Sequence, residues 1–196
     1  MMADSMIVRG VTRRARVGRL FAFLTGLLLI VVALRLMPLT INVTPSMPIG
    51  LYALGVLRGE IKRGDIVQVC APAEVASEGL ARGYLPAGPC PGGAGPLLKI
   101  VIARNGDTVE VEPSRLSVDG VAVPSSATRD IDSQGRPLVH LAPGRYHIGP
   151  GQLWLWTPYQ LSWDSRYYGT VPEQNVLRTA TLLLAFRSWN YASTAR

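Results

Sequence analysis

The chain has 196 residues, a formal net charge of +7 and 48 % hydrophobic residues, which allows one folded domain with an additional element or two small domains. Five arginines and one aspartate in the first nineteen residues account for +4 of this charge, and the remaining +3 is spread along the chain without a basic stripe. This distribution argues against a nucleic-acid-binding protein, so we expect no nucleic-acid partner.

An uncharged apolar run occupies residues 20–34, directly after a basic segment formed by residues 1–19. The run is short for a membrane span, but the side chain of Arg35 can reach the membrane surface, which extends the predicted anchor to residues 20–37. Because the arginines cluster on the N-terminal side, we predict that this side is cytoplasmic. Residues 38–196 are then a periplasmic domain, held at the inner membrane by a single pass.

Two alternatives to a membrane anchor remain at this point. The first is a buried core helix, but the run is apolar on all faces and has a basic flank, which favours an anchor. The second is a signal peptide cleaved after Ala33, which would release a secreted soluble protein. The small residues suited to such cleavage lie inside the apolar run itself, which favours an uncleaved anchor.

The remainder of the chain predicts short strands separated by turn residues. Asp119-Gly120 between two short apolar runs is a strong hairpin signal, because this pair suits a type I′ turn. No amphipathic helix of any length is evident, so the predicted fold class is all-β and barrel-like. Two segments rich in Gly, Pro, Ala and Ser, residues 71–96 and 124–137, are predicted surface insertions. The predicted strands cover residues 49–57, 66–70, 97–104, 108–112, 116–118, 121–123, 145–148, 152–156 and 176–186.

Cys70 and Cys90 are the only two cysteines. In an oxidising periplasm, one disulfide between them is the favoured interpretation, and it would tie the intervening excursion to the strand that ends at Cys70. A zinc site would also need His140 and His147. Their spacing does not resemble a compact structural zinc site, so we expect no metal.

Ser46 lies between two prolines, Pro45 and Pro48, just past the predicted anchor. Proline fixes its own φ and biases the residue before it toward an extended backbone, so Ser46 is held on a stiff path. A hydroxyl displayed in this way suits a nucleophile. An ordinary loop serine is the alternative, because serine is frequent in turns.

Only two of the 20 basic residues are lysines, Lys62 in a polar turn and Lys99 in an apolar run. A lysine activates a serine only as a neutral amine, so its pKa must fall by about three units, which disfavours the ammonium by roughly 4–5 kcal/mol. Burial of Lys99 in an apolar strand can supply this free energy. A lysine that faces solvent from an edge strand is the alternative.

Three stretches occur in a particular order along the chain. They read TPSMPIGLY at residues 44–52, LKIVIARNGD at residues 98–107 and SWDSRYYGTVP at residues 162–172. Together they resemble the type I signal peptidases, membrane-bound serine endopeptidases with a Ser-Lys dyad, over residues 17–186. The closer likeness is to the conjugative-transfer branch, the TraF type that processes pilin. Its marks are residues 46–52, the cysteine-bracketed insert and the single N-terminal anchor.

This resemblance implies roles for individual residues. By matching position, Ser46 corresponds to the nucleophile and Lys99 to the general base. Thr44 occupies the place of a hydroxyl that donates to the oxyanion, beside the N–H of Ser46. One departure is Ile100, where the family more often has arginine; the loss of this positive neighbour helps Lys99 to stay neutral.

The same resemblance implies three supporting residues. Ser162 matches a hydroxyl that orients the lysine amine, and Asp164 and Arg166 match a pair that holds this wall of the site. A structural turn with an ion pair is the alternative for Asp164 and Arg166.

The resemblance implies a signal-peptidase-like β-barrel or sandwich catalytic domain, and a serine endopeptidase that needs no cofactor. Its substrate would be a membrane-tethered precursor with small residues before the cleaved bond, such as a conjugative pilin, released by water or cyclised by an internal amine. The conjugation machinery is a further expected partner. The alternatives are a general preprotein signal peptidase I and a non-catalytic anchored scaffold of a secretion or conjugation complex. The joint presence of Ser46, Lys99 and Ser162 argues against the scaffold.

Overall fold

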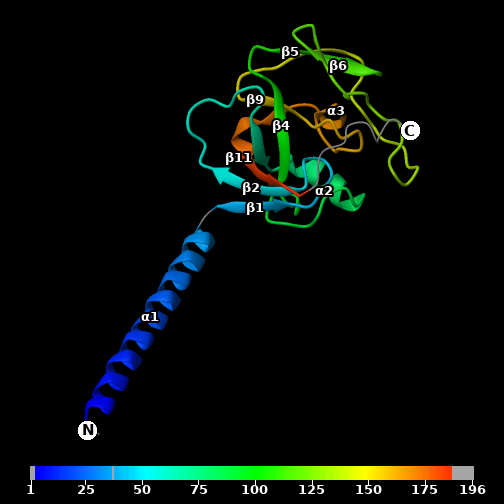
Figure 1. Ribbon diagram of the computed structural model, residues 1–196. Coiled ribbons are helices and arrows are strands. Elements are labelled where there is room, and N and C mark those ends of the chain that lie inside the picture. The colour runs from blue at the N-terminus through cyan, green and yellow to red at the C-terminus, as the bar shows by residue number, and fades with distance from the viewer. Residues whose placement is uncertain (1–2, 37, 187–196) are drawn as a thin grey trace. The chain divides into compact units, whose positions relative to one another are not determined.

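The computed structural model describes residues 3–36 and 38–186 (Figure 1). The chain divides into two units, residues 1–38 and residues 39–196, which we describe separately. Residues 1–2 of the predicted basic segment, Met37 of the predicted anchor and residues 187–196 of the predicted domain lie outside the described residues.

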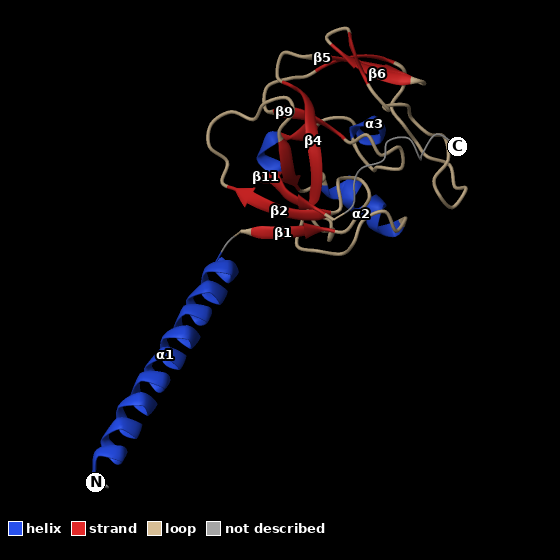
Figure 2. Cartoon of the chain, viewed as in Figure 1, coloured by secondary structure: helices blue, strands red, loops and turns tan. Residues whose placement is uncertain are grey.

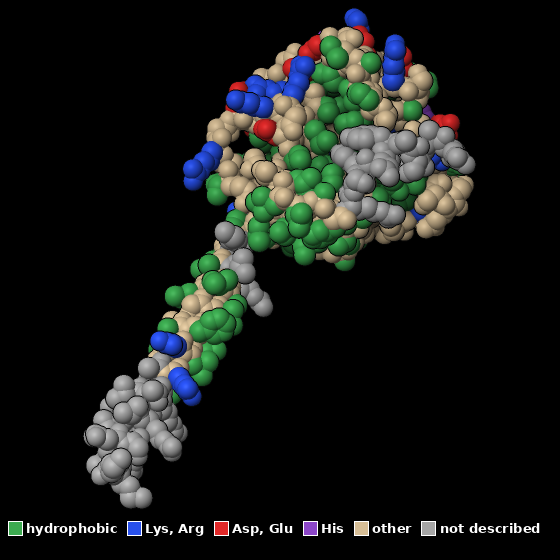
Figure 3. Space-filling view, in the orientation of Figure 1, with side chains coloured by type: hydrophobic (Ala, Val, Ile, Leu, Met, Phe, Trp, Pro, Cys, Tyr) green, Lys and Arg blue, Asp and Glu red, His purple; other side chains and the backbone are tan. Residues whose placement is uncertain are grey.

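The first unit consists of one helix, α1 (Ala3–Leu36). The helix covers both the predicted basic segment and the described part of the predicted anchor, because no proline interrupts it before Pro38. Residues 16–33 have a mean hydropathy of 1.9 and bury no side chain. Figure 3 shows hydrophobic side chains along this part of the helix. Among the described residues, α1 is the one helix long and apolar enough to cross a membrane.

The second unit is built mainly from antiparallel strands, which confirms the predicted all-β class (Figure 2). A seven-stranded sheet has the order β1-β2-β11-β3-β4-β9-β10, and a four-stranded sheet has the order β7-β6-β5-β8. The strands of the larger sheet are β1 (Leu39–Asn42), β2 (Gly50–Gly55), β3 (Ile66–Val69), β4 (Leu97–Arg104), β9 (Gln152–Trp156), β10 (Val171–Pro172) and β11 (Val176–Ala185). The strands of the smaller sheet are β5 (Thr108–Glu112), β6 (Arg115–Val118), β7 (Val121–Val123) and β8 (Gly144–His147).

The β6–β7 hairpin has the predicted turn. Asp119 and Gly120 both have positive φ, 49° and 78°, as a type I′ turn requires. Strands β4, β5, β7 and β9 have the predicted bounds, and the other predicted strands differ by one to three residues in all. Strands β1 and β10 were not predicted, because four and two residues carry too little alternation to stand out.

Strand β4 contributes to two parts of the core. Val101 packs in a cluster with residues of β3 and β9, whereas Ala103 packs in a second cluster that includes Trp154 and the inner residues of β5 and β6. The pairing of β4 with β9 shifts register between these two positions, and such an irregularity bends a strand. The bend lets one strand serve both clusters.

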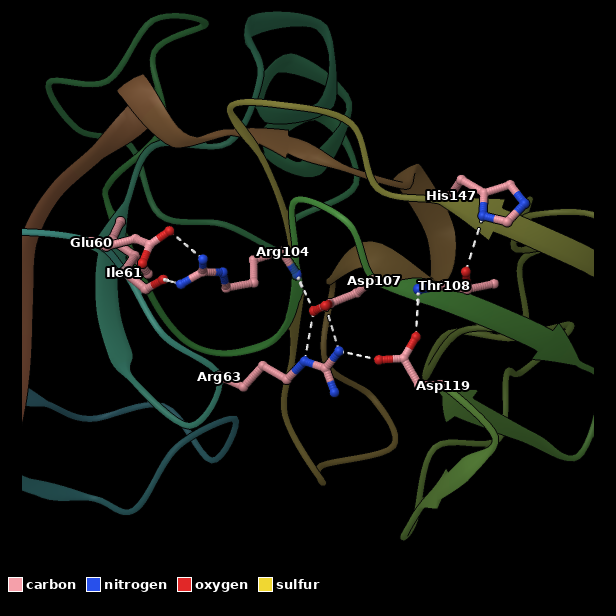
Figure 4. A network of polar contacts seen from close by, with 8 residues as sticks. All are labelled: Glu60, Ile61, Arg63, Arg104, Asp107, Thr108, Asp119 and His147. Atoms are coloured by element: carbon pink, nitrogen blue, oxygen red, sulfur yellow. Dashed lines mark hydrogen bonds and ion pairs between the residues drawn. The ribbon is translucent and has the colours of Figure 1, made fainter.

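A polar network on the surface joins turns of the two sheets (Figure 4). Arg63, which follows β2, donates to Asp107 at 2.6 Å and also pairs with Asp119 of the β6–β7 hairpin. Arg104 pairs with Glu60 close by. Arg63 and Asp119 are substantially exposed, so the network adds little stability and mainly orients the turns.

The segment of residues 71–96 was predicted as a surface insertion, and many of its residues are exposed. The segment contains helix α2 (Ala73–Ala81), and it buries Leu85 and Ala94 against Trp163. The nine-residue helix is too short and too rich in small residues for a clear amphipathic pattern. A second short helix, α3 (Ser165–Tyr168), was also not predicted.

The other predicted insertion, residues 124–137, has no helix or named strand among its described residues. It nevertheless buries Ser126 and Asp132. Ser126 accepts a hydrogen bond from the N–H of Leu116 at 2.7 Å, so this segment covers one side of the smaller sheet rather than projecting freely.

Candidate active site

Ser46 lies in the turn between β1 and β2, which pair with each other directly. Its side chain is half-buried, whereas Thr44 and Pro45 before it are exposed. The Ser46 hydroxyl lies 3.1 Å from the Thr44 hydroxyl. Among the described residues no hydrogen bond engages the Ser46 N–H. This serine therefore has a reachable hydroxyl and a free backbone donor.

Asn42, the last residue of β1, holds this turn together. Its amide group donates to the carbonyls of Thr44 at 2.8 Å and Met47 at 2.9 Å. Its carbonyl oxygen accepts from the Thr44 N–H at 3.2 Å and from the Thr44 hydroxyl at 2.8 Å. Asn42 was not among the predicted site residues. The available signal was an asparagine two residues before Thr44, the spacing at which its side chain bonds the backbone.

Lys99 lies on β4 and is 3 % exposed, on the same face as the buried Val101. Strand β4 pairs with β3 on one side and β9 on the other, so the alternative of an edge-strand lysine facing solvent is wrong. The Lys99 amine donates to the Ser162 hydroxyl at 2.7 Å. Residues 63 positions apart are thereby joined in a buried hydrogen bond.

Burial lowers the pKa of Lys99 from 10.5 to about 8. Removal from water is the main cause, because it disfavours the charged ammonium. The carboxylate of Asp164 opposes the change, and the guanidinium of Arg166 adds to it. The amine is therefore far closer to neutrality at physiological pH than an exposed lysine.

Asp164 and Arg166 form an ion pair in which both side chains are fully buried. Nε and Nη2 of Arg166 each donate to one carboxylate oxygen at 2.8 Å, a two-pronged geometry that is strong and directional. Asp164 also caps helix α3, and Arg166 donates to the carbonyl of Tyr159 at 2.9 Å. The pair thus holds the loop between β9 and α3, which carries Ser162.

A cleft of about 480 Å³ brings most of the candidate residues together. It is lined by residues 40–46, 83–86, 96–99 and 161–163, so Thr44, Ser46, Lys99 and Ser162 share it. Asp164 and Arg166 do not line it and lie behind its wall. No hydrogen bond joins Ser46 to Lys99 within the described part of the chain; each is held instead by a neighbouring hydroxyl.

Cys70 and Cys90 form a disulfide with their Cα atoms 5.5 Å apart, as predicted. The bond closes the segment that contains α2 and joins it to the end of β3. Across residues 3–36 and 38–186, no cluster of three or more His, Cys, Asp or Glu side chains suits a metal ion. His140 bonds Asp130, whereas His147 bonds Thr108 on a separate strand.

The sequence model of a family described as signal peptidase, peptidase S26, matches residues 14–185. The chain belongs to this peptidase family. The match covers α1 from its basic part onward and nearly all of the described β domain, including every candidate site residue.

Several curated relatives carry names from plasmid transfer. A conjugal transfer protein TraF of Agrobacterium fabrum is 40 % identical over 147 residues, which cover 74 % of this chain and 82 % of that protein. A conjugal transfer protein TraF of Agrobacterium tumefaciens is 36 % identical over 86 % of this chain and 97 % of its own length. A plasmid transfer protein TraF of Escherichia coli is 33 % identical over 70 % of this chain and 77 % of its own.

Among solved structures, a signal peptidase I from Enterococcus faecalis V583 is similar to this chain. The similar region covers 64 % of this chain and 100 % of the signal peptidase chain. The two are 18 % identical, with a TM-score of 0.39.

Proposed function

We propose that this S26-family chain is a membrane-anchored serine endopeptidase in which Ser46 is the nucleophile and Lys99 the general base. The observation that carries the proposal is the buried amine of Lys99, bonded to Ser162 in the same cleft as the accessible Ser46 hydroxyl. A base is most effective when its pKa lies near the working pH, and the pKa of Lys99 is lowered to about 8.

In the proposed reaction, the neutral Lys99 amine accepts the proton of the Ser46 hydroxyl as Oγ attacks the scissile carbonyl carbon. The N–H of Ser46 and the hydroxyl of Thr44 donate to the resulting oxyanion. Because the Thr44 hydroxyl donates to the side-chain oxygen of Asn42, it must rotate to reach the oxyanion. The Lys99 ammonium then gives its proton to the leaving amine, which leaves an ester on Ser46.

The ester is resolved by a second nucleophile. A water molecule that loses its proton to Lys99 gives a linear product. An amine at the other end of the same substrate gives a cyclic product, with loss of one water relative to the linear one. In both cases the Ser46 oxygen leaves and recovers a proton from Lys99.

The substrate segment in the cleft is an extended, uncharged peptide. Among the described residues, strand β1 is one of the two edges of the larger sheet, so its outer side can add a substrate strand. Among the described residues that line the cleft, Lys99 alone has an acidic, basic or imidazole side chain. A charged substrate side chain would therefore be desolvated there without a partner.

The membrane is the proposed location of this substrate. Apolar side chains on β1, on the turn after it, on β11 and directly after β11 are exposed, an uncommon arrangement for a surface that meets only water. These side chains are Ile41, Val43, Leu183, Leu184 and Phe186. A disulfide suits an oxidising compartment, so we place the β domain in the periplasm at the inner membrane. The relatives' names in plasmid transfer support a pilin precursor of a conjugation system.

Processing of candidate pilin precursors by the full chain in lipid vesicles, followed by intact mass, tests this function. Ser46→Ala should be inactive. Lys99→Arg should be as inactive as Lys99→Ala, because arginine keeps the charge but does not act as a base. Lys62→Arg is the matched control and should process normally, since Lys62 is exposed.

Near-normal processing by Lys99→Arg would reject the Ser-Lys mechanism. A product lighter than the trimmed linear peptide by one water would establish cyclisation. Processing of unrelated preproteins at the same rate would favour a general signal peptidase, and no processing of any precursor would favour a scaffold.

Ser162→Ala should retain part of the activity. It leaves both proposed dyad residues in place and removes one hydrogen bond to Lys99, so the rate should fall by roughly 5- to 30-fold for a loss of about 1–2 kcal/mol. Inactivity equal to that of Ser46→Ala would show that Ser162 does more than orient the amine.

A further inference from the structure

The loop that carries Ser162 packs against residues 71–96, a segment that the Cys70–Cys90 disulfide closes in part. Trp163, directly after Ser162, is 8 % exposed and packs in a cluster with Leu85 and other buried residues of this segment. A side chain added at Gly79 of α2 would lie 3.3 Å from the Trp163 indole nitrogen, so the backbone of α2 closely approaches this ring. Ser162 lies outside the strands, and its N–H donates to the carbonyl of Tyr159 at 3.0 Å. The packing of Trp163 therefore supports its position together with the Asp164–Arg166 pair.

Tyr84 is the residue of this segment that contacts both Trp163 and the opposite loop. Its ring lies 5.2 Å from that of Trp163, tilted by 51°. Its hydroxyl donates to Asp132 at 2.7 Å. Asp132 is 6 % exposed and also accepts from Nε of Arg136 at 2.6 Å and from its backbone N–H at 2.9 Å. The Arg136 guanidinium lies over the Tyr84 ring, 5.5 Å from its centroid.

A second set of contacts joins the same two segments beside Tyr84. Arg82 donates to the carbonyl of Pro137 at 2.8 Å, and Arg136 donates to the carbonyl of Arg82 at 2.7 Å. The hydroxyl of Tyr84 is therefore anchored within a network that ties residues 71–96 to residues 124–137. Tyr84, Ser162 and Trp163 all line the cleft. The first of these segments lines the cleft with residues 83–86 and Pro96, and the second lines it with Ser133.

We propose that Tyr84 is a positioning residue for the candidate base: its ring holds Trp163, and thereby keeps Ser162 aligned with the Lys99 amine and excludes water from that side. The inference rests on the proposed role of Lys99. Besides Ser162, the charged groups that act on the amine are Asp164 and Arg166, and both lie behind the wall that Tyr84 supports.

The test is the titration of Lys99 in Tyr84→Ala. The chain has only two lysines, so selective ¹³C labelling of lysine gives two signals by NMR for the full chain in detergent micelles, with Lys62 as internal reference. Truncation of the ring admits water beside the amine and relieves its desolvation, so we expect Lys99 to titrate about one pH unit higher. In processing assays, this shift should lower kcat about tenfold at pH 7. At high pH, kcat should return to the wild-type value, and KM should change little.

Tyr146→Ala is the matched control. The hydroxyl of Tyr146 likewise donates one hydrogen bond, here to the carbonyl of Ala142 at 2.7 Å. Its ring packs on a tryptophan, Trp154, with the ring centroids 5.7 Å apart and the planes tilted by 54°. It belongs to β8 of the smaller sheet and does not line the cleft. This variant should lose a similar amount of packing but leave the titration of Lys99 unchanged.

Tyr84→Phe keeps the ring and loses only the hydrogen bond to Asp132. It should therefore raise the pH at which Lys99 titrates by less than Tyr84→Ala does. An unmoved Lys99 in folded Tyr84→Ala, or an equal shift in Tyr146→Ala, overturns the proposal. If Tyr84→Ala does not fold, Tyr84→Leu, which also removes the aromatic ring, replaces it, and an unmoved Lys99 in that variant overturns the proposal. The NMR readout needs no substrate. Processing that survives in Lys99→Arg would therefore contradict the proposed function alone, whereas an unmoved titration contradicts this inference alone.

Discussion

Lys99→Met should make the β domain more stable at neutral pH, although it removes the candidate base. The pKa of Lys99 is lowered from 10.5 to about 8, and this difference of about 2.5 pH units corresponds to about 3 kcal/mol against burying the ammonium. Methionine has similar length and no charge to desolvate. The variant leaves the Ser162 hydroxyl without its partner, a cost of about 1–2 kcal/mol. We therefore expect a net gain of about 1–2 kcal/mol at pH 7.

The gain should depend on pH in a defined direction. Between about pH 8 and 10.5 the unfolded wild-type chain holds a proton on Lys99 that the native chain has released. The free energy of unfolding of the wild type therefore rises with pH across this window, whereas the methionine that replaces Lys99 in the variant does not titrate. Below pH 8 the advantage of the variant is complete. Near pH 10 most of it should be lost, and the missing hydrogen bond should then make the variant the less stable of the two.

Urea unfolding of the full chain in detergent, followed by tryptophan fluorescence at pH 7 and pH 10, measures these differences. Lys62→Met, which removes an exposed lysine, is the control and should not reproduce the gain in stability at pH 7. A Lys99→Met variant that is less stable than the wild type at pH 7, with a difference independent of pH, would refute the argument that Lys99 is held in an unfavourable desolvated position.

The remaining predictions concern the disulfide, the buried ion pair and the topology. Replacing Cys70 and Cys90 by alanine should lower the free energy of unfolding by about 3 kcal/mol in the chain-entropy model, given their separation of 20 residues. Arg166→Met should cost about 3–5 kcal/mol in urea unfolding, because it leaves Asp164 charged and buried, and adding Asp164→Asn should recover part of it. A reporter fused after Arg196 should be active only in the periplasm; cytoplasmic activity would overturn the predicted orientation.

Local pattern was enough to predict several parts of this protein. The apolar run after a basic segment predicted the helix now seen as α1, because length and composition alone decide whether a helix can cross a membrane. Alternation and turn residues predicted most strands, and Asp119-Gly120 predicted its own hairpin, because positive φ at both positions is a property of those residues. The three motifs around Ser46, Lys99 and Ser162 predicted the family.

Long-range contacts decided what local pattern could not. The burial of Lys99 depends on β4 lying between β3 and β9, and the same apolar run would expose its lysine at a sheet edge. The orientation of its amine depends on Ser162, 63 residues away. The contact of Tyr84 with Asp132 spans 48 residues, between two segments that their Gly- and Pro-rich composition predicted as surface insertions. Burial and hydrogen bonding of this kind belong to pairs of distant segments, so neither segment carries the signal alone.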